Sequence, residues 1–232
     1  MALVKFGGGV VQMSGSIGGT TYGRNRYGNI ARARTTPVNA NTARQSAIRA
    51  IMSSVSQSWF SALTAAQRAA WGVYASNVPA TNKLGEVIYL SGYNQFIKSN
   101  VAAQNAGLPA ISDAPTIFTL PGEDTSFAVA ISVASQELSV TIDESDDWLD
   151  EAGGAMIIQM GLPQNDSIEF FGGPYRHADS IDGDDTTPPT TPATVACPYV
   201  VAAEQKVWTR GRIIRADGRL SDWFRVNSIV GA

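Results

Sequence analysis

Carboxylates are the most concentrated chemistry-bearing residues of the chain. Six of them fall within nine positions: Asp143, Glu144, Asp146, Asp147, Asp150 and Glu151. Hydrolysis of a glycosidic bond needs two carboxylates in a cleft, with separated pKa values. A run as dense as this one is more typical of a solvated turn. We therefore expect the chain not to be an enzyme.

Metal binding would have to rely on carboxylates as well. His177 is the only histidine and Cys197 the only cysteine, so one chain cannot assemble a zinc site from nitrogen and sulfur ligands. The same histidine has no nucleophile elbow near it. The run Asp182-Gly183-Asp184-Asp185 offers oxygen ligands for calcium but lacks the spacing of an EF-hand loop. We expect a solvated acidic loop here and no cofactor, with calcium binding as the alternative.

Cations gather in a different place, between Ser14 and Arg49. This stretch has no acid and six arginines, which are Arg24, Arg26, Arg32, Arg34, Arg44 and Arg49. Tyr22 and Tyr27 lie among them, and such a set can neutralise phosphates and stack on bases. The glycines of residues 15–20 lack the spacing and the lysine of a phosphate-binding P-loop. The other interpretation is a basic arm that docks on an acidic protein surface.

The distribution of charge favours protein partners over nucleic acid. Residues 1–110 hold ten Lys/Arg and one acid, a charge of +9, whereas residues 111–232 hold seven and nineteen, a charge of −12. The whole chain is therefore net −3, and only 16% of its residues are charged. The basic half has a suitable partner in an acidic protein surface, including the acidic half of another copy. We expect nucleic acid not to be the partner.

Residues 1–41 are expected to form an extended basic arm. Val10, Val11 and Met13 predict a short strand, and the period-2 alternation after Thr20 predicts a β-hairpin that turns near Tyr27-Gly28-Asn29. The predicted extended run ends at Pro37. A two-stranded ribbon is marginal in water, so it should be completed by contact with something else.

Residues 42–110 are expected to be helical. Thr42 and Thr64 each begin a capping box, with Gln45 and Gln67 three positions further on. The first box predicts a helix over 43–61, and the second predicts a helix that begins after Thr64 and ends at about Ala75. Ser91 is expected to cap a third helix that ends at Gly107. A short strand is expected over 86–90, and Trp59 and Trp71 are expected in the core of the helical hairpin.

Residues 111–232 are expected to form an antiparallel β-sandwich of the immunoglobulin or fibronectin-III type, which makes the whole chain α+β. Strand-like runs cover 127–133, 138–142, 155–160, 206–216 and 220–229. Asp217-Gly218 predicts a hairpin between the last two. Trp148, Trp208 and Trp223 can line a sugar-binding surface, but core or interface packing is the expected role of at least two of them.

The first half of the chain resembles a group of phage and prophage proteins of unassigned activity. In that group an S-G-x-I/V-G segment precedes an R-x-R…P-x-N-P-x-T-x-x-Q stretch and two short helices. The matching positions are Ser14-Gly15-Ser16-Ile17-Gly18, Arg32-Ala33-Arg34, Pro37, Asn39, Asn41, Thr42, Gln45 and residues 65–71. Ala40 stands where the group has proline. The last two strands are similar to those of fibronectin-III or immunoglobulin-like modules. The resemblance implies a virion structural protein and carries no catalytic residues.

We therefore expect a component of a tailed-phage virion, made in the cytoplasm of the bacterial host. The favoured role is a capsid decoration (cement) protein that stabilises the shell and forms a homo-oligomer. Its partner would be the major capsid protein or another virion protein, contacted by Arg24, Arg26, Arg32, Arg34, Tyr22 and Tyr27. The alternatives are a tail or neck structural protein, and a host-surface or glycan-binding module carried by the sandwich. No apolar run approaches a membrane span, and the N-terminus is a poor signal peptide.

Overall fold

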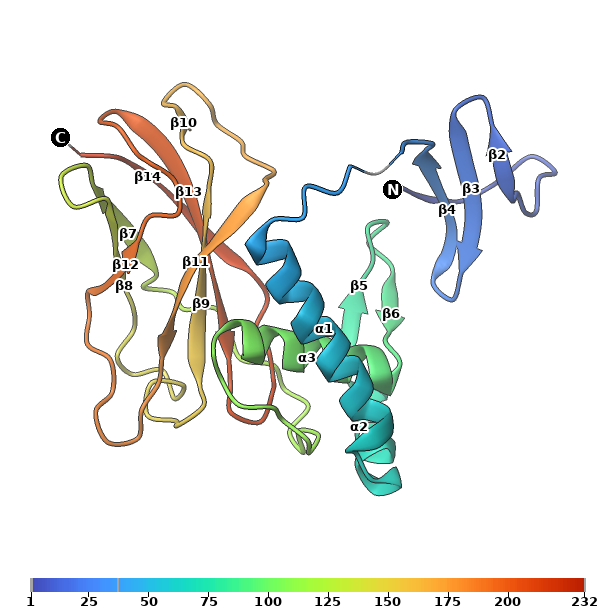
Figure 1. Cartoon of the computed structure of the whole chain (residues 1–232), viewed down its shortest axis with the longest axis horizontal. Coiled ribbons are helices and arrows are strands. Elements are labelled where there is room, and N and C mark those ends of the chain that lie inside the picture. Colours follow the sequence, from blue (N-terminus) through green and yellow to red (C-terminus); the bar gives the residue numbers. More distant parts are fainter. Residues whose placement is uncertain (1, 37, 232) are drawn as a thin grey trace.

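The computed structural model describes residues 2–36 and 38–231 and shows a mixed α+β protein. An N-terminal four-stranded antiparallel sheet is followed by three helices and then by several antiparallel sheets in the C-terminal half. These parts follow one another along the long axis of the molecule (Figure 1). The α+β expectation is thus confirmed. Within the described ranges, no helix has the length and apolar character that crossing a membrane requires.

The N-terminal sheet has the strand order β1-β4-β3-β2. Its strands are β1 (Ala2–Val4), β2 (Gly15–Ile17), β3 (Thr20–Asn25) and β4 (Gly28–Ala33). The predicted hairpin is β3–β4, but it turns at residues 26–27, because Asn25 pairs with Gly28. The positive φ of Gly28, 129°, suits glycine alone and lets the chain re-enter the sheet there.

Two expectations for this sheet need correction. Residues 10–13 do not form a strand, since Gly8 and Gly9 take positive φ values and turn the chain away before Val11, which is 89% exposed. The hairpin is also not an isolated two-stranded ribbon, because β1 and β2 of the same chain extend it to four strands. Pro37 lies outside the described residues.

The helices begin where their capping residues predict. α1 (Ala43–Ser61) and α2 (Ala65–Asn77) each have a complete capping box, and Ser91 caps α3 (Gly92–Asn105). The hydroxyls of Thr42 and Thr64 accept from the N–H groups of Gln45 and Gln67 at 3.3 and 3.2 Å. α2 runs two residues beyond the predicted end. The short hairpin of β5 (Pro79–Thr81) and β6 (Val87–Tyr89) joins α2 to α3.

The helices share a core built on aromatic residues. Trp71 and Tyr74 of α2 are 0% exposed and pack with Phe96 of α3 and Val55 of α1. The indole Nε1 of Trp71 donates to the carbonyl of Ser112 at 3.0 Å. The core placement of Trp71 is confirmed, and Trp59 lies partly buried against the same cluster.

The C-terminal half contains a three-stranded sheet, in the order β12-β8-β7, and a five-stranded sheet, in the order β10-β13-β9-β11 with β14 also paired to β13. The strands are β7 (Ala128–Ser132), β8 (Glu137–Thr141), β9 (Ala155–Gly161), β10 (Gln164–Asn165), β11 (Tyr175–Asp182), β12 (Ala193–Ala196), β13 (Gln205–Ile214) and β14 (Phe224–Ile229). Alternate residues of β7 and β8 share one buried cluster with residues of β9 and β13. Neither β11 nor β12 was expected from the sequence.

β9 is buried on both faces, which explains its continuous apolar run. Met156, Ile158 and Met160 belong to the cluster shared with the three-stranded sheet. On the opposite face, Ala155 and Ile157 pack with Ala103 of α3 and with Ala106, the residue that caps its C-terminal end, as do Ile214 and Leu220. α3 therefore covers part of the outer face of the five-stranded sheet.

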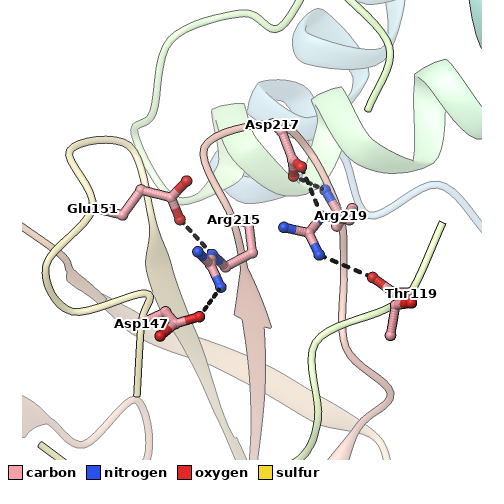
Figure 2. Close-up of polar contacts among 6 residues, drawn as sticks. All are labelled: Thr119, Asp147, Glu151, Arg215, Asp217 and Arg219. Atoms are coloured by element: carbon pink, nitrogen blue, oxygen red, sulfur yellow. Dashed lines mark hydrogen bonds and ion pairs between the residues drawn. The ribbon is translucent and has the colours of Figure 1, made fainter. Parts of the chain in front are cut away.

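The predicted Asp217-Gly218 hairpin is present between β13 and β14. Gly218 has a φ of 92°, and the N–H of Arg215 donates to the carbonyl of Arg219 at 3.0 Å. Figure 2 shows the two arginines that fasten this turn. Arg219 bonds to Asp217 and to the Thr119 carbonyl, while Arg215 reaches Glu151 and Asp147 on a neighbouring turn.

Candidate functional site

The four arm arginines named from the sequence do not converge on one face of the N-terminal sheet. Arg24 pairs with Asn29 and Arg32 with Thr21, and these two cross-strand pairs point to opposite faces because side chains alternate along a strand. Arg26 lies in the turn, and Arg34 follows β4. All four are exposed.

The two arm tyrosines are half-buried and make contacts within the chain. The ring of Tyr22 lies 6.5 Å from that of Phe6, centroid to centroid. The hydroxyl of Tyr27 accepts from Nδ2 of Asn94, on α3, at 3.0 Å. With the ion pair of Lys5 and Glu86, this bond attaches the sheet to the rest of the molecule.

The acidic runs serve as turn caps. Asp143 accepts from the N–H and the hydroxyl of Ser145, at 3.0 and 2.6 Å, and these bonds lower the pKa of its carboxyl. Asp184 accepts from the N–H groups of Thr186 and Thr187, which likewise lowers its pKa. Over residues 2–36 and 38–231, no three His, Cys, Asp or Glu side chains gather as a metal ion would require.

The feature with the most chemical content is a groove that the sequence did not indicate. It encloses about 1030 Å³ between the first turn of α1, one side of α3 and the outer face of β9, β11 and β13. It is lined by Thr42, Arg44, Gln45, Ile48, Lys98, Val101, Ala102, Asn105, Ile157, Gln159, Tyr175, Arg176, His177, Ala178, Tyr199, Arg212 and Trp223. In Figure 1 the N-terminal end of α1 faces β11 at this place.

The groove is cationic. Arg44, Lys98, Arg176 and Arg212 line it, and among the described residues no carboxylate does. Burial lowers the pKa of Lys98, and the charge of Arg212 lowers it further. Burial also lowers the pKa of Arg212. The carboxylate of Asp222 acts on both from a distance but is exposed and forms no ion pair in the described part of the chain.

At one side of the groove, consecutive polar contacts connect side chains from three elements. Arg44 of α1 donates to Oδ1 of Asn105 on α3, and Nδ2 of the same amide contacts Nδ1 of His177 on β11 at 3.5 Å. Burial lowers the pKa of His177, as does the charge of Arg44. Because the amide nitrogen of Asn105 can only donate, Nδ1 of His177 is the acceptor in this contact.

Aromatic rings fix the guanidinium groups around the groove. Arg210 lies 4.3 Å from the ring centroids of both Tyr175 and Trp223 and donates to Oε1 of Gln159 from Nε and Nη2. Arg176 lies 4.3 Å from the ring of Tyr199. Stacking restricts these side chains before any ligand arrives, which lowers the entropic cost of binding.

Of the three C-terminal tryptophans, only Trp223 reaches this groove. Trp148 and Trp208 are 1% and 5% exposed and belong to the interior, as expected for at least two of the three. A sugar surface made from all three is therefore wrong. The alternation along β13 places Arg210 and Arg212 on one face of the strand, but it does not indicate the α1 and α3 residues that complete the groove.

No family model matches the chain, and no curated protein matches it significantly. The functional argument therefore depends on the geometry of the N-terminal sheet and of the cationic groove.

Proposed function

We propose that the chain is a structural component of a tailed-phage virion, with capsid decoration as the favoured role. One observation carries the proposal: the N-terminal sheet has no core. None of residues 2–36 is buried, although they form four strands. Sheets are normally stabilised by an apolar face packed on another layer. A sheet without a single fully buried residue would gain that stability by docking on another subunit.

The surface of this sheet suits an acidic protein partner. Its arginines are exposed, and residues 2–36 contain no acid. Ile17 on the edge strand β2 is 68% exposed, and Val11 is 89% exposed. Charge-assisted hydrogen bonds from Arg24, Arg26, Arg32 and Arg34, together with burial of these apolar side chains, would offset the cost of ordering the contact. Major capsid protein, another virion protein or a second copy of this chain would supply the acids.

The C-terminal half would project from the shell as an immunoglobulin-like or fibronectin-III-like sandwich. The buried cluster that the two C-terminal sheets share supports this arrangement. A protein that binds only the assembled lattice stabilises it by mass action.

The experiment measures incorporation into purified particles. The variant Arg32→Ala/Arg34→Ala is expected to lower the number of copies per particle, most strongly at low salt, where exposed charges are least screened, while the thermal unfolding of the free protein stays unchanged. Arg225→Ala, which removes an exposed arginine from β14, serves as the matched control and should incorporate normally.

Copy number separates the two virion roles. A decoration protein is expected at hundreds of copies per particle, and a tail or neck ring at about a dozen or fewer. A count near twelve would replace decoration by the tail or neck role. Normal incorporation of the double variant at low salt would show that the arginines of the sheet do not anchor the protein.

A further inference from the structure

We propose that the cationic groove between α1, α3 and the five-stranded sheet binds a small polyanion, a molecule that presents several phosphate or carboxylate oxygens. This site is separate from the N-terminal sheet, so the inference does not rest on the role proposed above.

The first argument is uncompensated charge. Lys98 and Arg212 come from different elements, and each lies partly buried in the groove. The charge of Arg212 adds to burial in lowering the pKa of Lys98. Neither has a carboxylate within 4.0 Å in the described residues. Holding two such cations together without a counter-ion is unfavourable, and a bound anion removes that cost.

The second argument is the balance of hydrogen-bonding groups. The amide and threonine acceptors of the groove are already occupied: Oγ1 of Thr42 and Oε1 of Gln45 by each other's backbone N–H, Oε1 of Gln159 by Arg210, and Oδ1 of Asn105 by Arg44. The donors are in surplus. Within residues 2–36 and 38–231 the ammonium of Lys98 has no hydrogen bond, and Arg212 uses only Nε, on the Ser221 carbonyl at 2.8 Å.

A surplus of donors selects an acceptor-rich ligand. Phosphate and carboxylate groups only accept at neutral pH. A neutral saccharide brings hydroxyls that donate as well as accept, and the groove has few acceptors left for them. The same reasoning disfavours a peptide backbone, which brings one donor for every acceptor.

The surroundings strengthen an ionic contact at this place. Val101, Ala102 and Ile157 provide an apolar floor, which reduces the screening of charge by water. The first turn of α1 lines the groove, and residues 43–46 contain no acid, so the positive end of that helix dipole adds to the field. The volume is at the upper end of the roughly 300–1,000 Å³ usual for small-molecule sites.

The test is calorimetric titration of the full chain with inorganic pyrophosphate and with citrate, against chloride at matched ionic strength. These two probes distinguish a phosphate from a carboxylate source of the anion. At least one is expected to bind, and Lys98→Met/Arg212→Met is expected to weaken it at least tenfold. Lys83→Met/Arg225→Met makes the same change in charge at exposed positions outside the groove and should bind as the wild type does.

Thermal unfolding provides the second measurement. The binding probe should raise the Tm of the wild type but not that of the groove variant, and the groove variant without probe should unfold at or above the wild-type Tm because two unpaired cations have been removed. The proposal is overturned if neither probe exceeds the chloride background, or if both double variants bind equally. It is also overturned if maltose, an oligo-thymidylate or a poly-glutamate peptide binds more tightly than both small anions.

Discussion

The side chain of Asn100 pairs with the backbone of Ile111 as a neighbouring strand would. Its Oδ1 accepts from the N–H of Ile111 at 2.8 Å, and its Nδ2 donates to the carbonyl of Ile111 at 2.9 Å. Asn100 is 0% exposed and lies in the middle of α3. One amide thus holds the segment that connects the helices to the C-terminal sheets.

Replacing that amide should destabilise the protein strongly. Asn100→Ala leaves the N–H and the carbonyl of Ile111 without partners. At about 1–3 kcal/mol for each unsatisfied group, we expect a loss of about 2–6 kcal/mol in the free energy of unfolding. Asn100→Asp keeps the acceptor but turns an oxygen toward the Ile111 carbonyl, so it should not restore stability. Urea unfolding measures both, and a loss below 1 kcal/mol for Asn100→Ala would contradict the role of the pair.

Gly92 and Gly72 provide a matched pair of glycine substitutions where α3 meets α2. A Cβ on Gly92 would lie 2.7 Å from the backbone nitrogen of Gly72, whereas a Cβ on Gly72 meets no atom within 4 Å in the described part of the chain. Gly92→Ala must separate the helices and is expected to cost roughly 1–3 kcal/mol, as overpacking does. Gly72→Ala should instead stabilise by up to about 1 kcal/mol, since glycine inside a helix is unfavourable. Equal effects of the two variants in thermal unfolding would contradict this packing.

Tyr74 should make the protein sensitive to alkali. Burial, followed by the nearby charge of Asp217, raises the pKa of its hydroxyl to about 12. Between pH 10 and 12 the folded chain keeps a proton that the unfolded chain releases, so stability falls as pH rises, by roughly 2–3 kcal/mol in total. The variant Tyr74→Phe should remove this dependence. The hydroxyl has no hydrogen-bond partner among residues 2–36 and 38–231, so the loss of stability at pH 7 should be small. Chemical unfolding at pH 7 and pH 11 tests both statements.

Arg215 directly follows β13 and bonds to two carboxylates, which should contribute unequally to the stability of the fold (Figure 2). Nε of Arg215 donates to Glu151 at 2.5 Å and Nη1 to Asp147 at 3.2 Å. The side chain of Glu151 is 28% exposed and that of Asp147 is 82% exposed. Glu151→Gln is expected to cost about 1–2 kcal/mol, as a charge-assisted bond in a half-buried site does, and Asp147→Asn less than about 0.5 kcal/mol. The reverse order in urea unfolding would show that burial does not set the strength of these pairs.

The helices could be predicted because their signals are local. Thr42, Thr64 and Ser91 fix the first turns through bonds within three residues, and no distant contact is needed to place them. β11 could not be found in this way. Arg176, Asp179 and Asp182 are exposed along it, and only Ile181 is buried, so its extended form depends on pairing with β9.

The groove could not be predicted from the sequence either, because it also depends on contacts between distant parts of the chain. Lys98 and Arg212 lie far apart in the chain and meet only because α3 packs its small residues, such as Ala103, on the outer face of β9 and β13. For the arm residues, the sequence predicted the local structure but not a common binding face. Alternation predicted the β3–β4 hairpin, but the same alternation sends Arg24 and Arg32 to opposite faces.

The strand order of the N-terminal sheet also sets the sequence of events during synthesis. β1 is made first, yet Leu3 pairs only with Ile30, so it must wait until β4 has left the ribosome. The hairpin of β3 and β4 needs no such delay, because its partners are neighbours in the chain, and it therefore provides the template on which β1 is laid down. A fusion at the amino terminus would thus be attached to the strand that joins its sheet last, and it would compete with β1 for the open edge of β4.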